Sequence, residues 1–206
     1  MKKNINQNLS AHWLILALLF TAGFHQPGSD YEIESIVIHP PFENLFFSGE
    51  HPAGSEEHLG DRLGRDFSVM SFSEGDRRLP EAYKGDGMSN EDWFSWREPV
   101  LAPVEGVVEE MHINETTNRP GEIGEPPASS ITIRTEDGTR VRIAHVREIV
   151  VEEGDRISRG EFIARVGNNG ISFAPHIHIG AWKDETPLQI QVDLKRLGEL
   201  QGQMVD

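Results

Sequence analysis

The chain has 206 residues, of which 37% are hydrophobic and 26% are charged, values typical of one globular domain rather than of a disordered chain. The formal net charge of −15 gives a surface that repels phosphates, which excludes nucleic acid as a partner. Cysteine is absent, so disulfides, thiolate metal ligands and cysteine nucleophiles are excluded, and any metal must be bound by histidines and carboxylates.

Residues 1–26 have the pattern of an export signal. Lys2 and Lys3 precede an apolar run from Trp13 to Phe24, which is too short to cross a bilayer comfortably. Small residues at Ala22 and Gly23 suit cleavage, and an uncleaved anchor is the alternative and the one expected link to a membrane. We therefore expect an exported protein, periplasmic or extracellular.

Residues 27–45 are expected to form a linker and an N-terminal strand, and residues 46–200 a single domain. The strand is predicted at Glu32–Ile38, where polar and apolar residues alternate, and Pro40 and Pro41 end it. Short β-branched runs then recur between Gly, Asp and Glu, at 104–111, 131–134, 140–145, 149–151, 162–166 and 176–182. This spacing predicts an all-β fold, an antiparallel sandwich or barrel.

Two stretches interrupt the strands and are expected to be loop insertions. Residues 68–98 are rich in Gly, Ser and acids and contain Trp93, Phe94 and Trp96, which we expect to pin the insertion to the core. Residues 114–130 contain Asn, Pro and Gly throughout and are predicted to be a loop.

The strongest local signal is His176-Ile177-His178, which follows a Gly-Asn-Asn-Gly turn. Side chains of a strand alternate between faces, so His176 and His178 are predicted to project together and Ile177 to the opposite face. A solvated pair of histidines on an exposed face would show the same pattern.

Other potential ligands strengthen the metal interpretation. His58 precedes Asp66 by eight residues, and His145 ends an apolar strand. A catalytic zinc site has three N or O ligands and an open position for water. His145 as a buried core histidine is the alternative, and His51 is expected to be an ordinary loop residue.

Several segments together resemble a known family. APVEGVV (102–108), RIAHV, VVEEGDRISRGEFIARVGNNG and PHIHI are similar, in order and spacing, to the lysostaphin-type or LytM-type zinc endopeptidases, over about residues 49–182. The resemblance implies their duplicated hybrid β fold and one zinc ion.

The resemblance also implies the site residues. The metal ligands would be His58, Asp66 and His178, and the catalytic histidines His145 and His176. The commonest early motif is HxGxD, which would place Arg62 at the histidine position. Because arginine cannot ligate zinc, we align His58 with a longer variant of the motif.

The predicted function is therefore zinc-dependent hydrolysis of peptide bonds in the stem or cross-bridge peptides of peptidoglycan, through a metal-activated water. The alternative is an inactive LytM-like module that binds and activates another cell-wall hydrolase, which the arginine at 62 favours. A lipoyl or biotinyl carrier domain is disfavoured because no lysine lies between Val141 and Trp182. A phosphocarrier would act in the cytoplasm, against the export signal.

Overall fold

The computed structural model describes residues 32–53, 58–73 and 79–202, of which those from Ile33 onward belong to one compact unit, Ile33–Asp206. The expected signal segment, 1–26, lies outside the described residues. The elements are β1 (Ser35–Ile38), β2 (Phe46–Glu50), β3 (Arg65–Val69), β4 (Ser71–Phe72), β5 (Pro80–Glu81), η1 (Asn90–Asp92), β6 (Pro99–Leu101), β7 (Gly106–His112), β8 (Ser130–Arg134), β9 (Arg140–Ala144), β10 (Val146–Arg147), β11 (Arg156–Ile157), β12 (Phe162–Val166), β13 (Ile177–Lys183), β14 (Thr186–Val192) and α2 (Leu194–Gly202).

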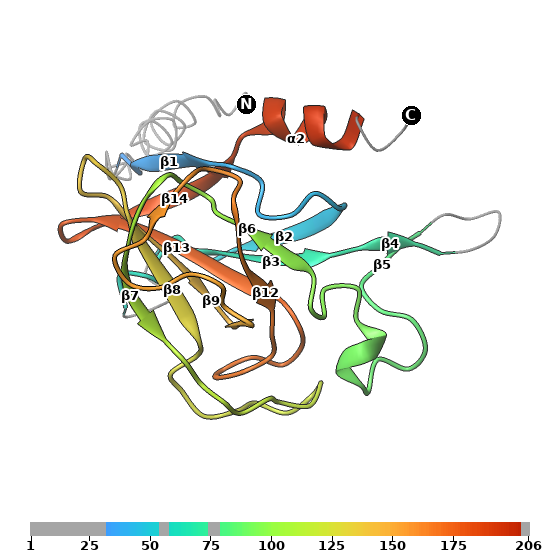
Figure 1. Ribbon diagram of the computed structural model, residues 1–206. Helices are drawn as coiled ribbons and strands as arrows, with labels where there is room; N and C mark the ends of the chain where they lie inside the picture. Colours follow the sequence, from blue (N-terminus) through green and yellow to red (C-terminus); the bar gives the residue numbers. More distant parts are fainter. Residues whose placement is uncertain (1–31, 54–57, 74–78, 203–206) are drawn as a thin grey trace, which may run out of the picture. The chain divides into compact units, whose positions relative to one another are not determined.

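The main sheet has the order β1-β14-β13-β9-β8-β7-β11, with β3 also paired to β13 and β2 to β3. Every pairing in it is antiparallel except β1 with β14. Figure 1 shows the strands from β14 to β7 side by side. The predicted all-β fold of the LytM type with loop insertions is confirmed.

The core lies between this sheet and a smaller sheet, β10-β12-β6. Residues of both sheets form one cluster of buried apolar side chains, in which Ile143 and Ile177 from the large sheet join Ile163 from β12. Ile177 and Ile179 are fully buried, as the strand alternation around the histidines predicted. The apolar face of β13 therefore anchors the strand and leaves its histidine face free for chemistry.

β13 is the element that gathers the predicted site. Its N-terminal half pairs on one side with β9, where His178 is opposite Ala144, and on the other side with β3, where His178 is opposite Asp66. Opposed residues of paired strands lie about 4.5–5.5 Å apart. Asp66 and the end of β9 are therefore held beside His178 by backbone pairing.

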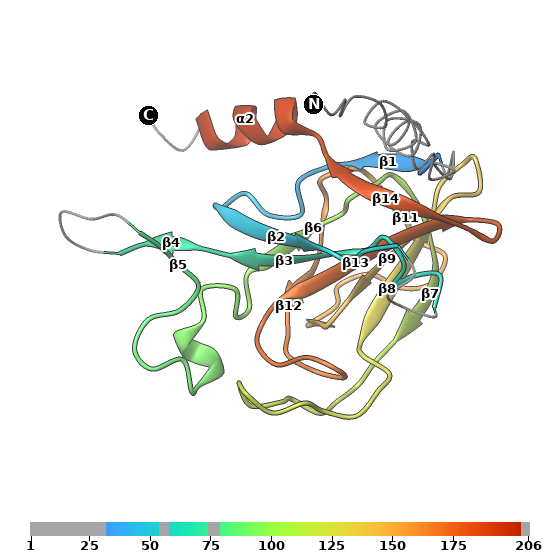
Figure 2. The same cartoon turned by 180° about the vertical axis from the view of Figure 1, so that it is seen from behind.

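The insertions take up ordered positions. β4 and β5 form a hairpin that extends beyond the end of β3 (Figures 1 and 2). Trp93 donates its indole hydrogen bond to the carbonyl of Gly87 and contacts Tyr83, and Phe94 packs against the core. The expected pinning to the core is seen for Phe94, and Trp96 lies under the guanidinium of Arg147 of β10, whereas these contacts of Trp93 stay within the insertion.

Two details differ from the expected elements. Residues 149–151 were expected to be a strand and form none; the chain instead forms β10 just before them, at Val146–Arg147. Glu148 has a φ of +46°, a left-handed conformation that ends the strand before Ile149. β2, β14 and α2 were not anticipated. No helix among the described residues is long and apolar enough to cross a membrane.

Candidate metal and catalytic site

β3 carries the candidate carboxylate. Phe67 and Val69 are buried on one face of β3, and Phe67 packs edge to face against Phe46 of the neighbouring β2. This apolar anchoring fixes the strand and turns Asp66, which is partly exposed, toward the opposite face. Both oxygens of Asp66 meet histidine rings there.

His178 is buried and held from both sides. Its Nδ1 is 2.9 Å from Asp66 Oδ1, and its Nε2 donates a 3.0 Å hydrogen bond to the carbonyl oxygen of Gly60. The carboxylate of Asp61 is 3.5 Å from the same Nε2. Metal-binding histidines characteristically donate their second ring nitrogen to a carbonyl or carboxylate, and His178 has that arrangement with Nδ1 toward Asp66.

The structure brings His51, not His58, to these two residues. His51 follows β2, and its Nε2 is 3.2 Å from Asp66 Oδ2. Its ring lies 4.8 Å from that of His178. His58 is exposed and is not part of this group; its carbonyl accepts from the N–H groups of Asp61 and Arg62 in a turn.

The expectation for His51 as an ordinary loop residue is therefore wrong. A signal for it was present in the sequence, since a short apolar run ends just before His51 and a second run begins at Asp66. Pairing of those runs as a hairpin, Gly49 opposite Asp66, places the two side chains together. The eight-residue spacing of His58 and Asp66 falls instead within the connection between the strands, at a turn that points the ring to solvent.

His145 and His176 form a second pair beside this group. Their ring centroids are 4.7 Å apart, and His176 Nε2 is 3.8 Å from Asp66 Oδ1. His145 Nδ1 donates to the carbonyl of Asn169 and His176 Nδ1 to that of Ala174, each at 2.8 Å. Because carbonyls accept only, each neutral ring has its lone pair on Nε2.

His145 also has an unusual backbone. Its φ is +63°, which costs about 1–3 kcal/mol for a residue other than glycine. The conformation occurs where β9 ends and β10 begins, and the carbonyl of His145 accepts from Gly167 N–H at 2.8 Å. The surrounding turn therefore holds the strained residue, as is common at functional sites.

Burial and neighbouring charges set the protonation of the four groups. Burial and the nearby His176 lower the pKa of His145 to about 3, and burial also lowers the pKa of His176. Burial opposes ionisation of Asp66, but its histidine partners outweigh burial and lower the carboxyl pKa. Burial likewise opposes protonation of His178, yet the hydrogen bond and charge of Asp66 raise its pKa. At neutral pH the His145–His176 pair is therefore uncharged.

The donor set fits a catalytic zinc ion. The potential ligand atoms of His51, Asp66 and His178 all lie within 4.8 Å of one another. His51 Nδ1 is buried without a hydrogen-bond partner, which indicates a ring not yet fully satisfied by the protein. Two imidazoles and one carboxylate, with further positions left for water or substrate, match the composition of catalytic zinc sites.

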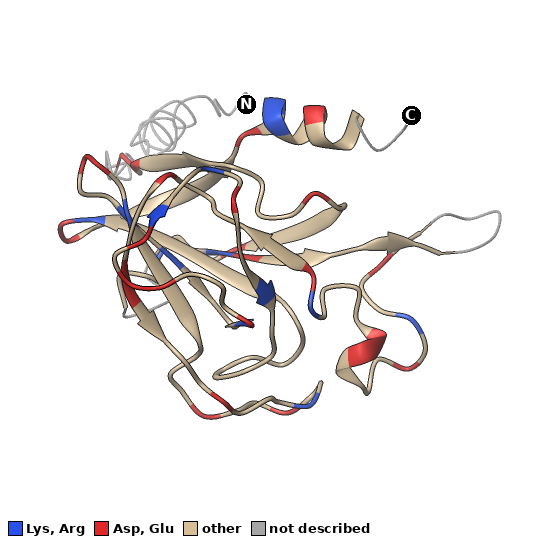
Figure 3. Cartoon of the chain, in the orientation of Figure 1, with Lys and Arg blue, Asp and Glu red and all other residues tan. Residues whose placement is uncertain are grey.

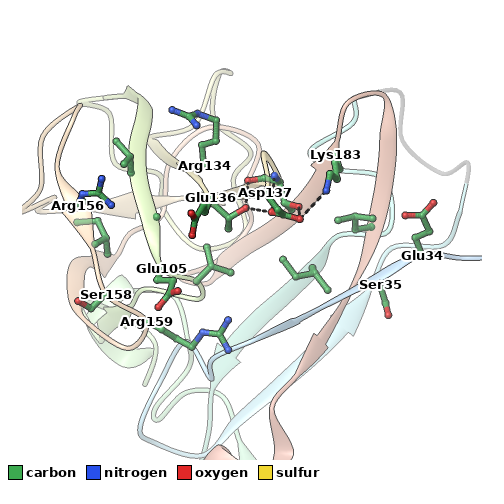
Figure 4. A pocket seen from close by; sticks show the side chains of 18 residues that line it. Glu34, Ser35, Glu105, Arg134, Glu136, Asp137, Arg156, Ser158, Arg159 and Lys183 are labelled. Atoms are coloured by element: carbon green, nitrogen blue, oxygen red, sulfur yellow. Dashed lines mark hydrogen bonds and ion pairs between the residues drawn. The ribbon is translucent and has the colours of Figure 1, made fainter.

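Cavities are also found away from these histidines. One of about 970 Å³ is lined by apolar residues that include Val104 and Leu188 and by charged residues, among which Lys183 pairs with Asp137 (Figure 4). It shares no residue with the histidine cluster. A second, of about 320 Å³, lies between residues 113–117 and the turn at Gly167–Asn169, next to the group that holds His145.

Comparisons with known proteins agree with the motifs. Residues 94–190 match the model of Peptidase family M23, a span that includes His145, His176 and His178 and begins after His51 and Asp66. Among solved structures, a zinc containing peptidase from Vibrio cholerae has 18% identity and a TM-score of 0.44, with coverage of 75% of this chain and 39% of that one. The catalytic domain of lysostaphin from Staphylococcus simulans has 21% identity, a TM-score of 0.42 and coverage of 75% and 92%. A mutant catalytic domain of the prophage-encoded M23 protein EnpA from Enterococcus faecalis has 17% identity, a TM-score of 0.44 and coverage of 70% and 86%. Residues 94–190 of this chain therefore match Peptidase family M23, in line with the LytM-type motifs of the sequence.

Proposed function

We propose that this protein is a zinc-dependent endopeptidase that hydrolyses peptide bonds in bacterial peptidoglycan. The observation that carries the proposal is the convergence of His51, Asp66 and His178 beside the uncharged pair His145 and His176. Ligand residues and proton-transfer residues thus occupy one site, as hydrolysis by an activated water requires.

His51, Asp66 and His178 would hold the zinc ion, which when bound polarises the scissile carbonyl and lowers the pKa of water to about 7. Asp66 also contacts His176, so it links the ligand group to the proton acceptor. The carbonyl of Gly60 fixes the ring of His178 through Nε2. This leaves Nδ1 of His178 on the ligand side.

His176 would act as the general base. Its Nδ1–H is occupied by Ala174, so Nε2 is free to accept a proton, and its lowered pKa keeps it neutral when the reaction begins. His145 has the same tautomer and presents an acceptor rather than an N–H. Its role would be to receive at Nε2 the proton that His176 takes from the water and pass it to the leaving amine, because its own N–H is held by the carbonyl of Asn169.

We propose peptidoglycan peptides as substrate and the cell envelope as the site of action, supported by the match of residues 94–190 to Peptidase family M23 and by the export-signal pattern expected from the sequence of residues 1–26. We also propose a catalytic unit that includes the N-terminal strand, since β1 pairs with β14 in the main sheet. The domain boundary expected at residue 46 would separate β1 from β14, with which it pairs.

The test is release of peptides from purified peptidoglycan, with and without a chelator, together with the zinc content of the protein. Wild-type protein should bind one zinc ion and release peptides only without chelator. His178→Ala and His51→Ala should lose both zinc and activity, whereas His58→Ala should keep both.

Each contrary result has a defined meaning. Loss of zinc in His58→Ala with retention in His51→Ala would return the ligand to residue 58. A wild-type protein that binds no zinc and releases nothing would be an inactive binding module. In that case the arginine at position 62, where the common motif has histidine, would mark the loss of the site.

A further inference from the structure

The turn between β12 and β13 contacts both histidines of the catalytic pair. Asn169 accepts from His145 through its backbone carbonyl. The side chain of Asn169 accepts from the N–H of Ser129 at 2.7 Å and donates to the carbonyl of Val146 at 2.9 Å. The Asn169 side chain is almost completely buried, so these bonds hold the turn against the end of β9.

Ser172, in the same turn, contacts the other histidine. Its hydroxyl oxygen is 3.3 Å from His176 Nδ1, 2.9 Å from Asn168 Oδ1 and 2.9 Å from the carbonyl of Ala174. Ser172 is 3% exposed. A hydroxyl has one hydrogen, so it can accept from His176 Nδ1–H while donating to Asn168.

Asn168 extends this series of hydrogen bonds into both insertions. Its side-chain nitrogen donates to Asn90 Oδ1 at 2.9 Å, and Asn90 donates to the carbonyl of Asn118 at 2.8 Å. Asn90 belongs to the 68–98 insertion and Asn118 to the 114–130 loop. Asn118 in turn donates its side-chain hydrogens to the carbonyls of Gly170 and Ser172, at 2.9 and 3.0 Å.

The hydrogen bonds of this chain share one direction. Each donor points away from His176, from Ser172 to Asn168, then to Asn90 and the backbone of Asn118. The Nδ1–H of His176 itself donates to the carbonyl of Ala174, with the Ser172 hydroxyl as a second, longer contact. Reversing the ring to its other tautomer would leave Nδ1 as an acceptor facing the carbonyl of Ala174. Chains of buried hydrogen bonds reinforce one another and penalise an unsatisfied member.

We propose that Ser172, Asn168 and Asn90 are positioning residues that hold the carbonyl of Ala174 against His176 Nδ1–H, and so fix the tautomer of His176 and make it depend on the packing of the two insertions. The consequence for catalysis rests on the proposed function, because Nε2 must carry the lone pair for His176 to accept a proton. The insertions, which contribute none of the three proposed zinc ligands, thereby set whether the base is correctly presented.

The test compares variants of the full-length protein as purified with zinc. Ser172→Ala removes the hydroxyl that contacts Asn168, the carbonyl of Ala174 and His176 Nδ1, while the Ala174 carbonyl itself stays. Asn90→Ala removes the far end of the series of hydrogen bonds, at a residue that is only half-buried. Ser172→Thr keeps the hydroxyl. Ser95→Ala is the matched control, because Ser95 is also fully buried and its hydroxyl also accepts a hydrogen bond, from Val69 N–H at 2.8 Å.

Two measurements are needed, steady-state kinetics and the tautomer of His176 from ¹⁵N NMR of the imidazole. Ser172→Ala should lower kcat by about 10-fold, the lower end of the losses seen when hydrogen-bond partners of metal-ligating histidines are removed. KM should stay within about twofold of wild type, and a population with Nε2–H should appear. Asn90→Ala should show a smaller loss of the same kind, Ser172→Thr should recover the wild-type tautomer, and Ser95→Ala should change neither reading.

An unchanged kcat and tautomer in both Ser172→Ala and Asn90→Ala would overturn the proposal. So would an equal loss of kcat in Ser95→Ala, since that would indicate general loosening. If Ser172→Ala does not fold, the kcat and the His176 tautomer of Asn90→Ala alone test the proposal. If wild-type protein hydrolyses nothing, the proposed function fails, while the NMR measurement still decides whether the chain fixes the tautomer.

Discussion

Gly64 shows how closely the early segment approaches the late strand. A Cβ built on it would lie 2.5 Å from His178 Cε1 and 2.7 Å from Nε2, closer than atoms can approach without displacement. Gly64→Ala is therefore expected to push the buried imidazole away from Asp66. Overpacking of this kind costs about 1–3 kcal/mol, measurable as a lower free energy of unfolding in urea, and zinc affinity should fall with it.

Gly198 provides the control for this prediction. It lies in α2, and nothing is within 4 Å of a Cβ added there. Gly198→Ala should leave zinc affinity unchanged and raise the free energy of unfolding by up to about 1 kcal/mol, because alanine favours the helix. Equal zinc affinity in Gly64→Ala and wild type would show that zinc binding does not require the observed position of the His178 ring.

The sequence predicts which side chains lie close together when they belong to the same strand. It predicts this less well when the two residues are joined through a turn. His176 and His178 share a face because strand geometry alternates, and the short contacts of both to Asp66 agree with that. His51 reaches the site only through a hairpin register that no local pattern fixes. The bonds of Ser172 and Asn169 depend on how three loops meet, which composition alone does not specify.

At the scale of elements, β13 is central because strands on both sides deliver side chains to it. β9 ends at Ala144 opposite His178 and so delivers His145, and β3 delivers Asp66. β2 adds His51 by pairing with β3. Each link is a backbone pairing, so the four histidines and the carboxylate are positioned by the register of one sheet.

Strands with strong β-branched runs are the ones that the sequence predicts well. Phe162–Val166 has the expected bounds, and β7, β8, β9 and β13 agree to within one or two residues at most ends. β14, by contrast, contains a proline and two glutamines and resembles a loop in composition. Its strand conformation comes from pairing with β13 and β1, a tertiary effect that overrides local propensity.

The packing of α2 depends on a buried histidine far from the site along the chain. His39 Nδ1 donates to the carbonyl of Pro40 at 2.7 Å, and its Nε2 accepts from Arg196 of α2 at 3.4 Å. Burial lowers the pKa of His39, and the charges of Arg196 and Arg159 lower it further, against smaller opposing effects of Pro40 and Asp193. The ring is therefore neutral in the folded protein over a range where it is protonated in the unfolded chain.

The sign of the pH effect follows. Because the folded pKa lies below the unfolded value of 6.5, the stabilisation present above pH 6.5 is lost as the pH falls from there toward the folded pKa. His39→Gln removes this titration. Its deficit in free energy of unfolding relative to wild type should therefore narrow between about pH 7.5 and 5.5, measured by urea unfolding of the zinc-free proteins.

Leu200→Ala separates this effect from simple loss of packing. Leu200 is the buried residue of α2, and its removal should cost about 2–5 kcal/mol without removing a titrating group. The deficit of Leu200→Ala should be nearly constant over the same pH range. If the deficit of His39→Gln is equally constant, protonation of His39 does not influence the packing of α2.

For the whole molecule, charge does not explain recognition of a substrate. Acidic residues lie along loops and strand ends of the described unit rather than on one element (Figure 3), and the net charge is −15. A diffuse negative field does not attract an anionic wall polymer. Binding of the proposed substrate would therefore depend on contacts within the site, where the neutral pair His145 and His176 lies.

A zinc ion would join parts of the molecule that are far apart in the chain. Asp66 and His178 are separated by 112 residues along the chain. His51 lies in the segment between β2 and β3. A ligand that binds only the folded state stabilises it by about 2.7 kcal/mol at a concentration about 100 times its Kd. For a domain of this size each kcal/mol raises Tm by about 2–4 °C, so zinc should raise Tm by about 5–10 °C over chelator-treated protein.

The variants assign this shift to the site rather than to surface binding. His178→Ala and His51→Ala should unfold at the same temperature with and without zinc, because the ligand group is broken in each. His58→Ala should retain the full rise, since His58 is exposed and lies outside the group. An identical Tm for wild type in excess zinc and in chelator would mean that the three strands gather these side chains without binding the ion, and the protein would then act through its surface rather than through hydrolysis.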